Sequence, residues 1–181
     1  MSVKLIAIDL DGTLLNSHHQ ITPAVSAAVT RAKEKGLHVI LTSGRPFNGI
    51  LPYLRELGLD KANHYCISNN GAVIHDAEPG EPVIETLMDF EDYRYFEALA
   101  RDINVHFHVL SNGEMFTTNR DISHYTLMDA YLTQTQLHYR PLAEMDSEMQ
   151  FSKFMMIDNP LRLNEAAGYI PQVSFDSYNI L

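Results

Sequence analysis

The sequence predicts an α/β fold with a parallel β-sheet in its first half, followed by an α+β module. Two observations lead to this prediction. Three short apolar runs alternate with two segments whose apolar residues recur at helical spacing, as in βαβ units. Past about residue 83 this alternation stops, and pairs of apolar runs around short polar turns replace it. We therefore expect a core domain over residues 1–84 and a second domain over residues 85–181.

The first strand is expected from Val3 to Ile8. This run is apolar except for Lys4, and it ends at a polar turn that begins with Asp9. A nearly continuous apolar run is typical of a strand that is buried on both faces. We therefore expect a central strand of the parallel sheet.

Two helices are expected between the first three strands. Thr22 and Pro23 supply an N-cap and a first-turn proline for one helix, which ends before Gly36. The other helix begins at Pro46 and ends before Gly58. The residues expected to face the core are Val25, Ala28, Val29 and Ala32 in the first helix, and Ile50, Leu54 and Leu57 in the second.

Polar turns follow the second and third strands as well. Leu37–Leu41 leads into the turn 42–45, and Tyr65–Ile67 leads into the turn 68–71. Parallel strands place their carboxyl ends at one edge of the sheet, which is where open α/β sheets bind ligands. We therefore expect the three turns to lie together at that edge.

The second module is expected to contain antiparallel hairpins and helices. A hairpin of 72–74 with 83–84 is expected at the border between the two domains. The expected elements beyond it are a helix capped by Asp89, strands 105–110 and 115–118, a helix over 122–133, a strand over 151–157, a short helix from Asn159 and a last strand over 173–175.

Composition excludes several classes of partner. The 181 residues carry a formal net charge of −10, which would repel a phosphate backbone, so nucleic acid is not an expected partner. No apolar stretch approaches the roughly 18 residues of a membrane span, so we expect no membrane partner. The run 3–8 is too short for a signal sequence. The single Cys66 excludes an internal disulfide and favours a cytoplasmic location.

The strongest chemical signal is the segment Asp9-Leu10-Asp11-Gly12-Thr13, directly after the first strand. A turn beyond the end of a strand can direct Asp9 and Asp11 into one small volume. Two carboxylates so close would repel each other, which raises the pKa of one of them or recruits a divalent cation. The structural alternative is a solvated turn.

These residues resemble the haloacid dehalogenase superfamily of phosphotransferases, whose first motif is Asp-x-Asp-Gly-Thr. Ser43, within Thr-Ser-Gly-Arg-Pro, resembles the second motif, and Asn70-Gly71-Ala72 resembles the signature of the Cof-type sugar phosphatases. Together with residues 107–108 and 119–123, these segments are similar to the YidA-like members. The resemblance covers essentially the whole chain. It implies a Rossmann-like core with an α+β cap domain.

The resemblance also implies a catalytic mechanism. Asp9 would attack phosphorus and form an aspartyl-phosphate, while Asp11 would protonate the leaving oxygen and then activate water. Mg²⁺ would be held by the Asp9 side chain and the Asp11 backbone carbonyl. The implied activity is Mg²⁺-dependent hydrolysis of small phosphorylated metabolites such as sugar phosphates.

Substrate binding is implied at the same three turns. Backbone N–H groups from Leu10 to Gly12, the Ser43 hydroxyl and the Gly44 amide would hold the transferring phosphoryl oxygens. Asn70 would help to orient them.

The sequence departs from the family pattern on its C-terminal side. The family carries a third-motif Lys and a fourth-motif acidic pair after the cap, but the last Lys here is Lys153, and no Gly-Asp followed by Asn-Asp occurs after Ile157. The chain thus resembles one truncated within the cap at Leu181, with low or absent turnover expected if it is complete as it stands. The missing strands would leave a sheet edge uncovered, and a homodimer that covers this edge is one hypothesis.

Other functions stay open at this point. A phosphomutase of the same superfamily shares the Asp-x-Asp-Gly-Thr motif. A non-catalytic remnant or an interaction module is an alternative of another class. Dehalogenation is disfavoured because the members of the superfamily that perform it lack the second Asp of the motif, whereas Asp11 is present here.

Several residues also have an ordinary structural interpretation. Asn70-Gly71 could be only a turn that needs positive φ. His106 and His108 share one face of a strand, and packing or the lining of a cap pocket is favoured over transition-metal binding. Cys66, in a buried strand, is expected to be an inert thiol.

Overall fold

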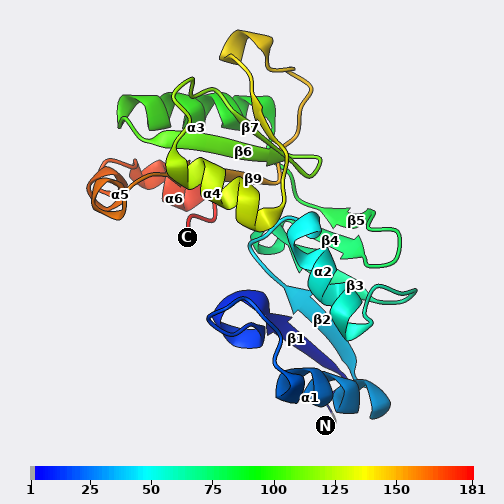
Figure 1. Cartoon of the computed structure of the whole chain (residues 1–181). Helices are drawn as coiled ribbons and strands as arrows, with labels where there is room; N and C mark the ends of the chain where they lie inside the picture. The colour runs from blue at the N-terminus through cyan, green and yellow to red at the C-terminus, as the bar shows by residue number, and fades with distance from the viewer. Residues whose placement is uncertain (1–2) are drawn as a thin grey trace. The chain divides into compact units, whose positions relative to one another are not determined.

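The chain folds into two compact units, each with its own β-sheet (Figure 1). The computed structural model describes residues 3–181. Unit 1 comprises Met1–Leu87 with Thr133–Thr135, and unit 2 comprises Met88–Leu132 with Gln136–Leu181. The expected domains, 1–84 and 85–181, differ from these units by residues 85–87 and 133–135. No helix within residues 3–181 is long and apolar enough to cross a membrane.

Unit 1 contains a five-stranded sheet in the order β1-β2-β3-β4-β5. The first three strands are parallel, as predicted, and β4 and β5 continue the sheet as an antiparallel hairpin, also as predicted. The strands are β1 (Leu5–Asp9), β2 (His38–Thr42), β3 (Tyr65–Ser68), β4 (Val73–Asp76) and β5 (Pro82–Glu85). The mixed α/β architecture confirms the predicted fold class.

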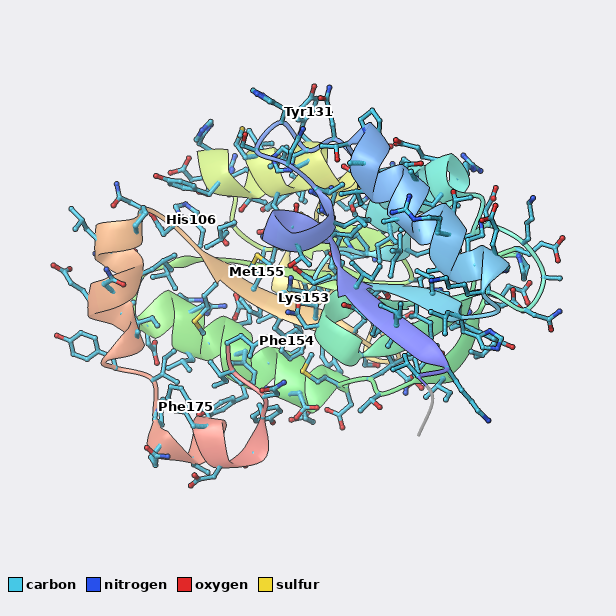
Figure 2. All side chains as sticks on the ribbon, turned by 90° about the horizontal axis from the view of Figure 1, so that it is seen from below. His106, Tyr131, Lys153, Phe154, Met155 and Phe175 are labelled. Atoms are coloured by element: carbon cyan, nitrogen blue, oxygen red, sulfur yellow. The ribbon has the colours of Figure 1, made fainter. Side chains whose placement is uncertain are left out.

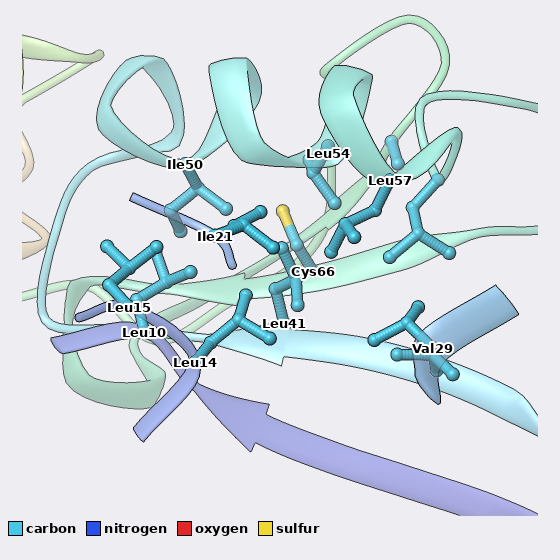
Figure 3. Close-up of a cluster of buried hydrophobic side chains, with 13 residues drawn as sticks. Leu10, Leu14, Leu15, Ile21, Val29, Leu41, Ile50, Leu54, Leu57 and Cys66 are labelled. Atoms are coloured by element: carbon cyan, nitrogen blue, oxygen red, sulfur yellow. The ribbon is translucent and has the colours of Figure 1, made fainter. Parts of the chain in front are cut away.

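Two helices pack their apolar faces against the sheet of unit 1 (Figure 3). The first is α1 (Pro23–Glu34), capped by the Thr22 hydroxyl, which accepts a hydrogen bond from the backbone N–H of Val25. The second is α2 (Phe47–Leu57), which ends at Gly58 with a φ of 61°, a conformation that suits glycine. Their core-facing side chains pack with strand residues in one cluster, which includes Val29, Leu41, Ile50, Leu54, Leu57 and Cys66.

The prediction that the first strand is central and buried on both faces is wrong for this structure. β1 lies at an edge of the sheet, and within the described residues it pairs only with β2. Its side chains alternate between exposed and half-buried, and Leu5 is 49% exposed. An apolar run indicates burial on both faces only when strands and helices cover both sides, and residues 3–181 place none beside the outer edge of β1.

Unit 2 contains a four-stranded sheet in the order β8-β7-β6-β9. Its strands are β6 (His106–Ser111), β7 (Glu114–Thr117), β8 (Leu137–Tyr139) and β9 (Lys153–Ile157). Its helices are α3 (Phe90–Asp102), α4 (His124–Thr133), α5 (Pro160–Ala167) and α6 (Gln172–Ser177). The β6–β7 hairpin, the Asp89 cap of α3 and the Asn159 cap of α5 agree with the expectations from the sequence.

Aromatic side chains form the core of unit 2 between α3 and the sheet. Tyr93 is almost fully buried and stacks on Phe151, with ring centroids 5.0 Å apart. Phe154 on β9 joins the same cluster, whereas Lys153 and Met155, its neighbours on the strand, lie along the other face of the sheet (Figure 2). This alternation follows from the two-residue period of a β-strand.

Two elements of unit 2 differ from the prediction. The expected strand over 173–175 is part of helix α6, which follows Pro171 and leaves Val173 and Phe175 exposed (Figure 2). Alternating β-branched and aromatic residues favour a strand locally, but no strand of the described chain pairs with this segment. Strand β8 was not predicted because it has only three residues, and it becomes a strand by pairing with β7.

Candidate active site at the carboxyl ends of the parallel strands

Three polar turns meet at the carboxyl ends of β1, β2 and β3 in unit 1. Asp9, the last residue of β1, lies in register with Thr42, the last residue of β2, which in turn lies in register with Ile67. The turns that follow are 10–14, 43–46 and 69–71. All seven residues proposed for the site therefore belong to one edge of one sheet.

The first turn holds Asp9 and Asp11 at the surface. It is a short π-helical turn, Leu10–Leu14, in which the backbone N–H of Leu15 donates to the carbonyl of Leu10 at 2.9 Å. Leu10 and Leu14 are buried in the core and fix the turn, while Asp9, Asp11 and Gly12 are exposed. Gly12 has a φ of 80°, which a side chain would disfavour.

Backbone hydrogen bonds tie the second and third turns to each other. The N–H of Ser43 donates to the carbonyl of Ile67 at 2.9 Å, and the N–H of Asn70 donates to the carbonyl of Ser43 at 3.1 Å. The N–H of Asn69 donates to the carbonyl of Arg45 at 3.0 Å. Ser43 and Asn70, which are 27 residues apart in sequence, are thus neighbours in space.

The third turn has an uncommon backbone. Asn69, Asn70 and Gly71 have φ values of 49°, 58° and 99°, so three successive residues are left-handed. Asparagine is one of the few non-glycine residues that tolerates this region, although at some cost. The turn interpretation of Asn70-Gly71 is therefore correct for the backbone, and it does not conflict with a role for the Asn70 side chain.

Gly44 allows the third turn to approach the second. A Cβ atom at Gly44 would lie 2.9 Å from the Asn70 Oδ1 atom, which is closer than carbon and oxygen normally approach. Only a residue without a side chain allows the Asn70 amide to lie here.

Arg45 binds both carboxylate oxygens of Asp11 through two nitrogens of its guanidinium. Its Nε donates to Asp11 Oδ2 at 2.8 Å, and its Nη2 donates to Asp11 Oδ1 at 2.7 Å. These hydrogen bonds lower the pKa of the Asp11 carboxyl and raise the pKa of Arg45. His19 adds a ring nitrogen 3.4 Å from Asp11 Oδ1, and the Arg45 guanidinium lies 5.7 Å from the centroid of the Tyr53 ring.

Neither Arg45 nor His19 was among the predicted site residues. Arg45 stood in the Thr-Ser-Gly-Arg-Pro segment, so the motif contained the signal, but 34 residues separate it from Asp11. No motif in the sequence pointed to His19. It lies in the loop between the first turn and α1, where its own φ is 55°, and its position depends on the path of that loop.

The donor chemistry of the first turn suits Mg²⁺. The exposed Asp9 carboxylate and the Asp11 backbone carbonyl are hard oxygen donors, and Mg²⁺ commonly combines one or two such donors with water molecules. Among residues 3–181, no group of three or more His, Cys, Asp or Glu side chains could hold a metal ion. The first turn thus offers two oxygen atoms of the kind that Mg²⁺ accepts as ligands.

The other candidate residues lie elsewhere. His106 Nδ1 is 2.7 Å from Asp158 Oδ2, and His108 Nε2 is 3.1 Å from Asp129 Oδ2. Each histidine is thus engaged with its own carboxylate in unit 2, an arrangement that fits packing better than a shared transition metal. Burial raises the pKa of the Cys66 thiol to about 12, which keeps the thiol protonated and unreactive.

Comparisons with known proteins agree on one family. Residues 6–180 match the haloacid dehalogenase-like hydrolase family. A Streptococcus pyogenes protein with a provisional phosphatase name is 40% identical over 181 residues, which are 100% of this chain and 67% of that protein. A Bacillus subtilis protein with a similar provisional name is 36% identical, over 98% of this chain and 66% of that protein.

A solved structure shows the same fold. The crystal structure of a haloacid dehalogenase-like hydrolase from Bacteroides thetaiotaomicron matches with a TM-score of 0.76 and 26% identity, over 93% of this chain and 63% of that one. The chain therefore spans about two thirds of the length of these relatives. On the evidence of the family match, the sequence relatives and the shared fold, the chain belongs to the haloacid dehalogenase-like hydrolases.

Proposed function

We propose that this chain carries the catalytic residues of a phosphatase for small phosphorylated metabolites, such as sugar phosphates. The observation that carries the proposal is the meeting of three polar turns at the ends of β1, β2 and β3. An exposed carboxylate, Asp9, stands there beside groups that can bind phosphoryl oxygens. This combination of a nucleophile and several hydrogen-bond donors is what phosphoryl transfer requires.

The reaction would proceed in two displacements at Asp9. A carboxylate oxygen of Asp9 attacks phosphorus, the bond to the ester oxygen breaks, and Asp11, in its protonated form and no longer paired with Arg45, donates its proton to the departing alkoxide, which leaves as the alcohol. Asp11 then takes a proton from water, and the resulting hydroxide attacks phosphorus of the aspartyl-phosphate. Inorganic phosphate leaves, and the Asp9 carboxylate is restored.

The second and third turns would hold the phosphoryl oxygens. The Ser43 oxygen already accepts a hydrogen bond from the backbone N–H of Arg45 at 3.1 Å, so its own hydroxyl proton is available to donate to a phosphoryl oxygen. The Asn70 amide lies against Gly44, and Gly44 belongs to the same turn as Ser43. Backbone N–H groups from Leu10 to Gly12 would complete the cradle.

Magnesium fits this scheme as a charge neutraliser. When bound through the Asp9 carboxylate and the Asp11 carbonyl, Mg²⁺ would reduce the repulsion between that carboxylate and an approaching phosphoryl group.

Names of further relatives support the substrate class. An Escherichia coli relative, 35% identical over 99 residues, is named as a pyridoxal phosphate phosphatase. A Bacillus subtilis relative, 38% identical over 78 residues, is named as a 5-amino-6-(5-phospho-D-ribitylamino)uracil phosphatase. Both names refer to small phosphorylated compounds, and each match covers half of this chain or less.

The test is phosphate release from a panel of sugar phosphates by the 181-residue chain in the presence of Mg²⁺, with Asp9→Asn purified in parallel. We expect turnover that Asp9→Asn abolishes. Incubation with acetyl phosphate, followed by rapid acid quenching and mass spectrometry, tests the covalent step when turnover is slow, and we expect one phosphoryl group on Asp9. Turnover that survives in Asp9→Asn, or neither turnover nor labelling of Asp9, would overturn the proposal. Return of phosphate to the sugar would indicate a phosphomutase.

A further inference from the structure

Within the candidate site, the Arg45 guanidinium is bound to a carboxylate of the chain itself, that of Asp11. Both oxygens of Asp11 accept hydrogen bonds from Arg45, at 2.7 and 2.8 Å. This two-point geometry is the one that a guanidinium uses for carboxylates and for phosphates alike, because both present two oxygens in one plane. Asp11 therefore stands where an oxygen pair of a phosphoryl group would also fit.

Arg45 is the fixed member of this ion pair. Its side chain is only 13% exposed and packs over the Tyr53 ring. Its backbone is held on both sides, because its N–H donates to Ser43 Oγ and its carbonyl accepts from the N–H of Asn69. The guanidinium is thus anchored beside the two turns proposed to bind phosphate.

Asp11 is the exchangeable member. Its side chain is 46% exposed, so water can solvate the carboxylate when the ion pair opens. Hydration of the freed carboxylate lowers the net cost of opening the pair. An incoming phosphoryl dianion carries more charge than the carboxylate and can displace it from Arg45.

We propose that Arg45 binds the phosphoryl group of the substrate and that the Asp11 carboxylate occupies this position only in the ligand-free chain. The inference rests on the proposed function and extends it. Substrate binding would release Asp11 from Arg45, so that the acid–base residue becomes available only when a phosphate ester is present. The ligand class is a phosphate monoester, recognised through two oxygens of its phosphoryl group.

The proposal predicts how Arg45 and Asp11 affect the binding of inorganic phosphate. Asp11→Asn removes the carboxylate that competes with phosphate, so both nitrogens of Arg45 should then be available to bind phosphate. Replacing Arg45 by Ala in the Asp11→Asn background should therefore weaken phosphate binding by about tenfold or more, as the loss of a charge-assisted hydrogen-bond pair does. With Asp11 in place, Arg45→Ala should weaken phosphate binding less. Phosphate must then break the Asp11–Arg45 ion pair before it can bind Arg45, so Arg45 contributes less to its affinity.

The experiment is isothermal titration calorimetry with inorganic phosphate at constant ionic strength on the wild-type chain and the three variants of this cycle, which are Asp11→Asn, Arg45→Ala and the double variant. Arg45→Lys, which keeps the charge but not the two-point geometry, should weaken binding by several fold in the Asp11→Asn background. Arg55→Ala is the matched control, since Arg55 is an exposed arginine in the last turn of α2, the helix that follows Arg45, and it should change affinity less than about twofold. Circular dichroism melts establish that each variant folds.

The outcomes separate this inference from the proposed function. Phosphate affinity that stays within about twofold on replacing Arg45 in the Asp11→Asn background would overturn the inference and leave the phosphatase proposal standing. Equal losses from Arg45→Ala and Arg55→Ala would also overturn it, because general electrostatics would then explain the effect. A folded chain that binds no phosphate in any variant would overturn the proposed site as a whole.

Discussion

At the scale of single residues, hydrogen-bond direction assigns the state of His75. The Gly80 carbonyl can only accept, so His75 Nδ1, 3.0 Å away, carries the proton and donates to it. The other ring nitrogen, Nε2, lies 3.0 Å from the hydroxyl of the buried Ser68, which can donate to it or to the Val73 carbonyl at 3.4 Å. Burial favours the neutral imidazole, in which Nε2 accepts the shorter of these two bonds, and the contact joins the end of β3 to the β4–β5 hairpin.

His75 should therefore contribute to stability in a pH-dependent way. Burial lowers its pKa from the ordinary value of 6.5, so the unfolded chain binds the proton more readily than the folded one. The free energy of unfolding should be highest above that value and should fall as the pH drops through it toward the lower pKa of the folded state. His75→Gln keeps one hydrogen bond and does not titrate, so urea unfolding between pH 7.5 and about pH 5 should show a flatter profile than the wild type. Identical profiles would contradict this assignment.

At the scale of secondary-structure elements, the contact between the second and third turns depends on Gly44. In Gly44→Ala the new methyl carbon would lie 2.9 Å from Asn70 Oδ1, so the Asn70 side-chain amide would have to leave its position beside the second turn. We expect phosphate affinity and any turnover to fall at least tenfold, with a loss of stability of about 1 kcal/mol. Calorimetric titration and denaturant unfolding measure the two effects. Gly36→Ala, at the end of α1 with positive φ but open space, is the control that should lose stability alone.

Helix α3 offers a test of local capping in unit 2. The Asp89 carboxylate accepts hydrogen bonds from the N–H groups of Glu91 and Asp92 at 2.9 and 3.0 Å, and the N–H of Asp89 donates to the Asp92 carboxylate at 3.0 Å. Asp89→Ala should lower the free energy of unfolding by about 1 kcal/mol. Asp89→Ser should restore most of it, because serine also caps. Denaturant titration would detect the difference, and an equal loss in both variants would argue against capping as its cause.

The elements also show what the sequence can predict. Thr22, Asp89 and Asn159 were identified as helix caps because a cap acts on residues next to it in the chain. Helix α6 was missed because the local pattern of Val173 and Phe175 favours a strand, while the absence of a partner strand in the described chain decides against it. Strand pairing involves residues far apart in sequence and leaves no local signal.

The same reasoning applies to the site. Asp9, Asp11 and Ser43 were predicted to lie together because each follows a strand at a recognisable spacing, and the strands do end at a common edge. The ion pair of Asp11 with Arg45 depends on two turns meeting in space, so neither spacing nor composition could predict it. Motifs thus locate the reactive edge, and only the fold shows how its charges are paired.

At the scale of the whole molecule, the sheet of unit 1 has an outer edge without a partner strand in the described chain. β1 carries an uncharged sequence, Leu5 to Ile8, at that edge, and Leu5 and Ala7 are exposed. Unpaired, uncharged edges promote pairing with another chain. The homodimer hypothesis therefore predicts that two copies of the chain pair through β1, as antiparallel neighbours about a two-fold axis.

Ala7→Lys tests this association directly. A lysine on an edge strand opposes edge-to-edge pairing, because two copies would bring like charges together in the dimer and bury them against an apolar edge. Multi-angle light scattering should give the mass of a dimer for the wild type and of a monomer for Ala7→Lys. Ala27→Lys, on the exposed side of α1, adds the same charge away from the edge and should stay dimeric. A monomeric wild type, or a dimer that persists in Ala7→Lys, would show that β1 does not mediate the contact.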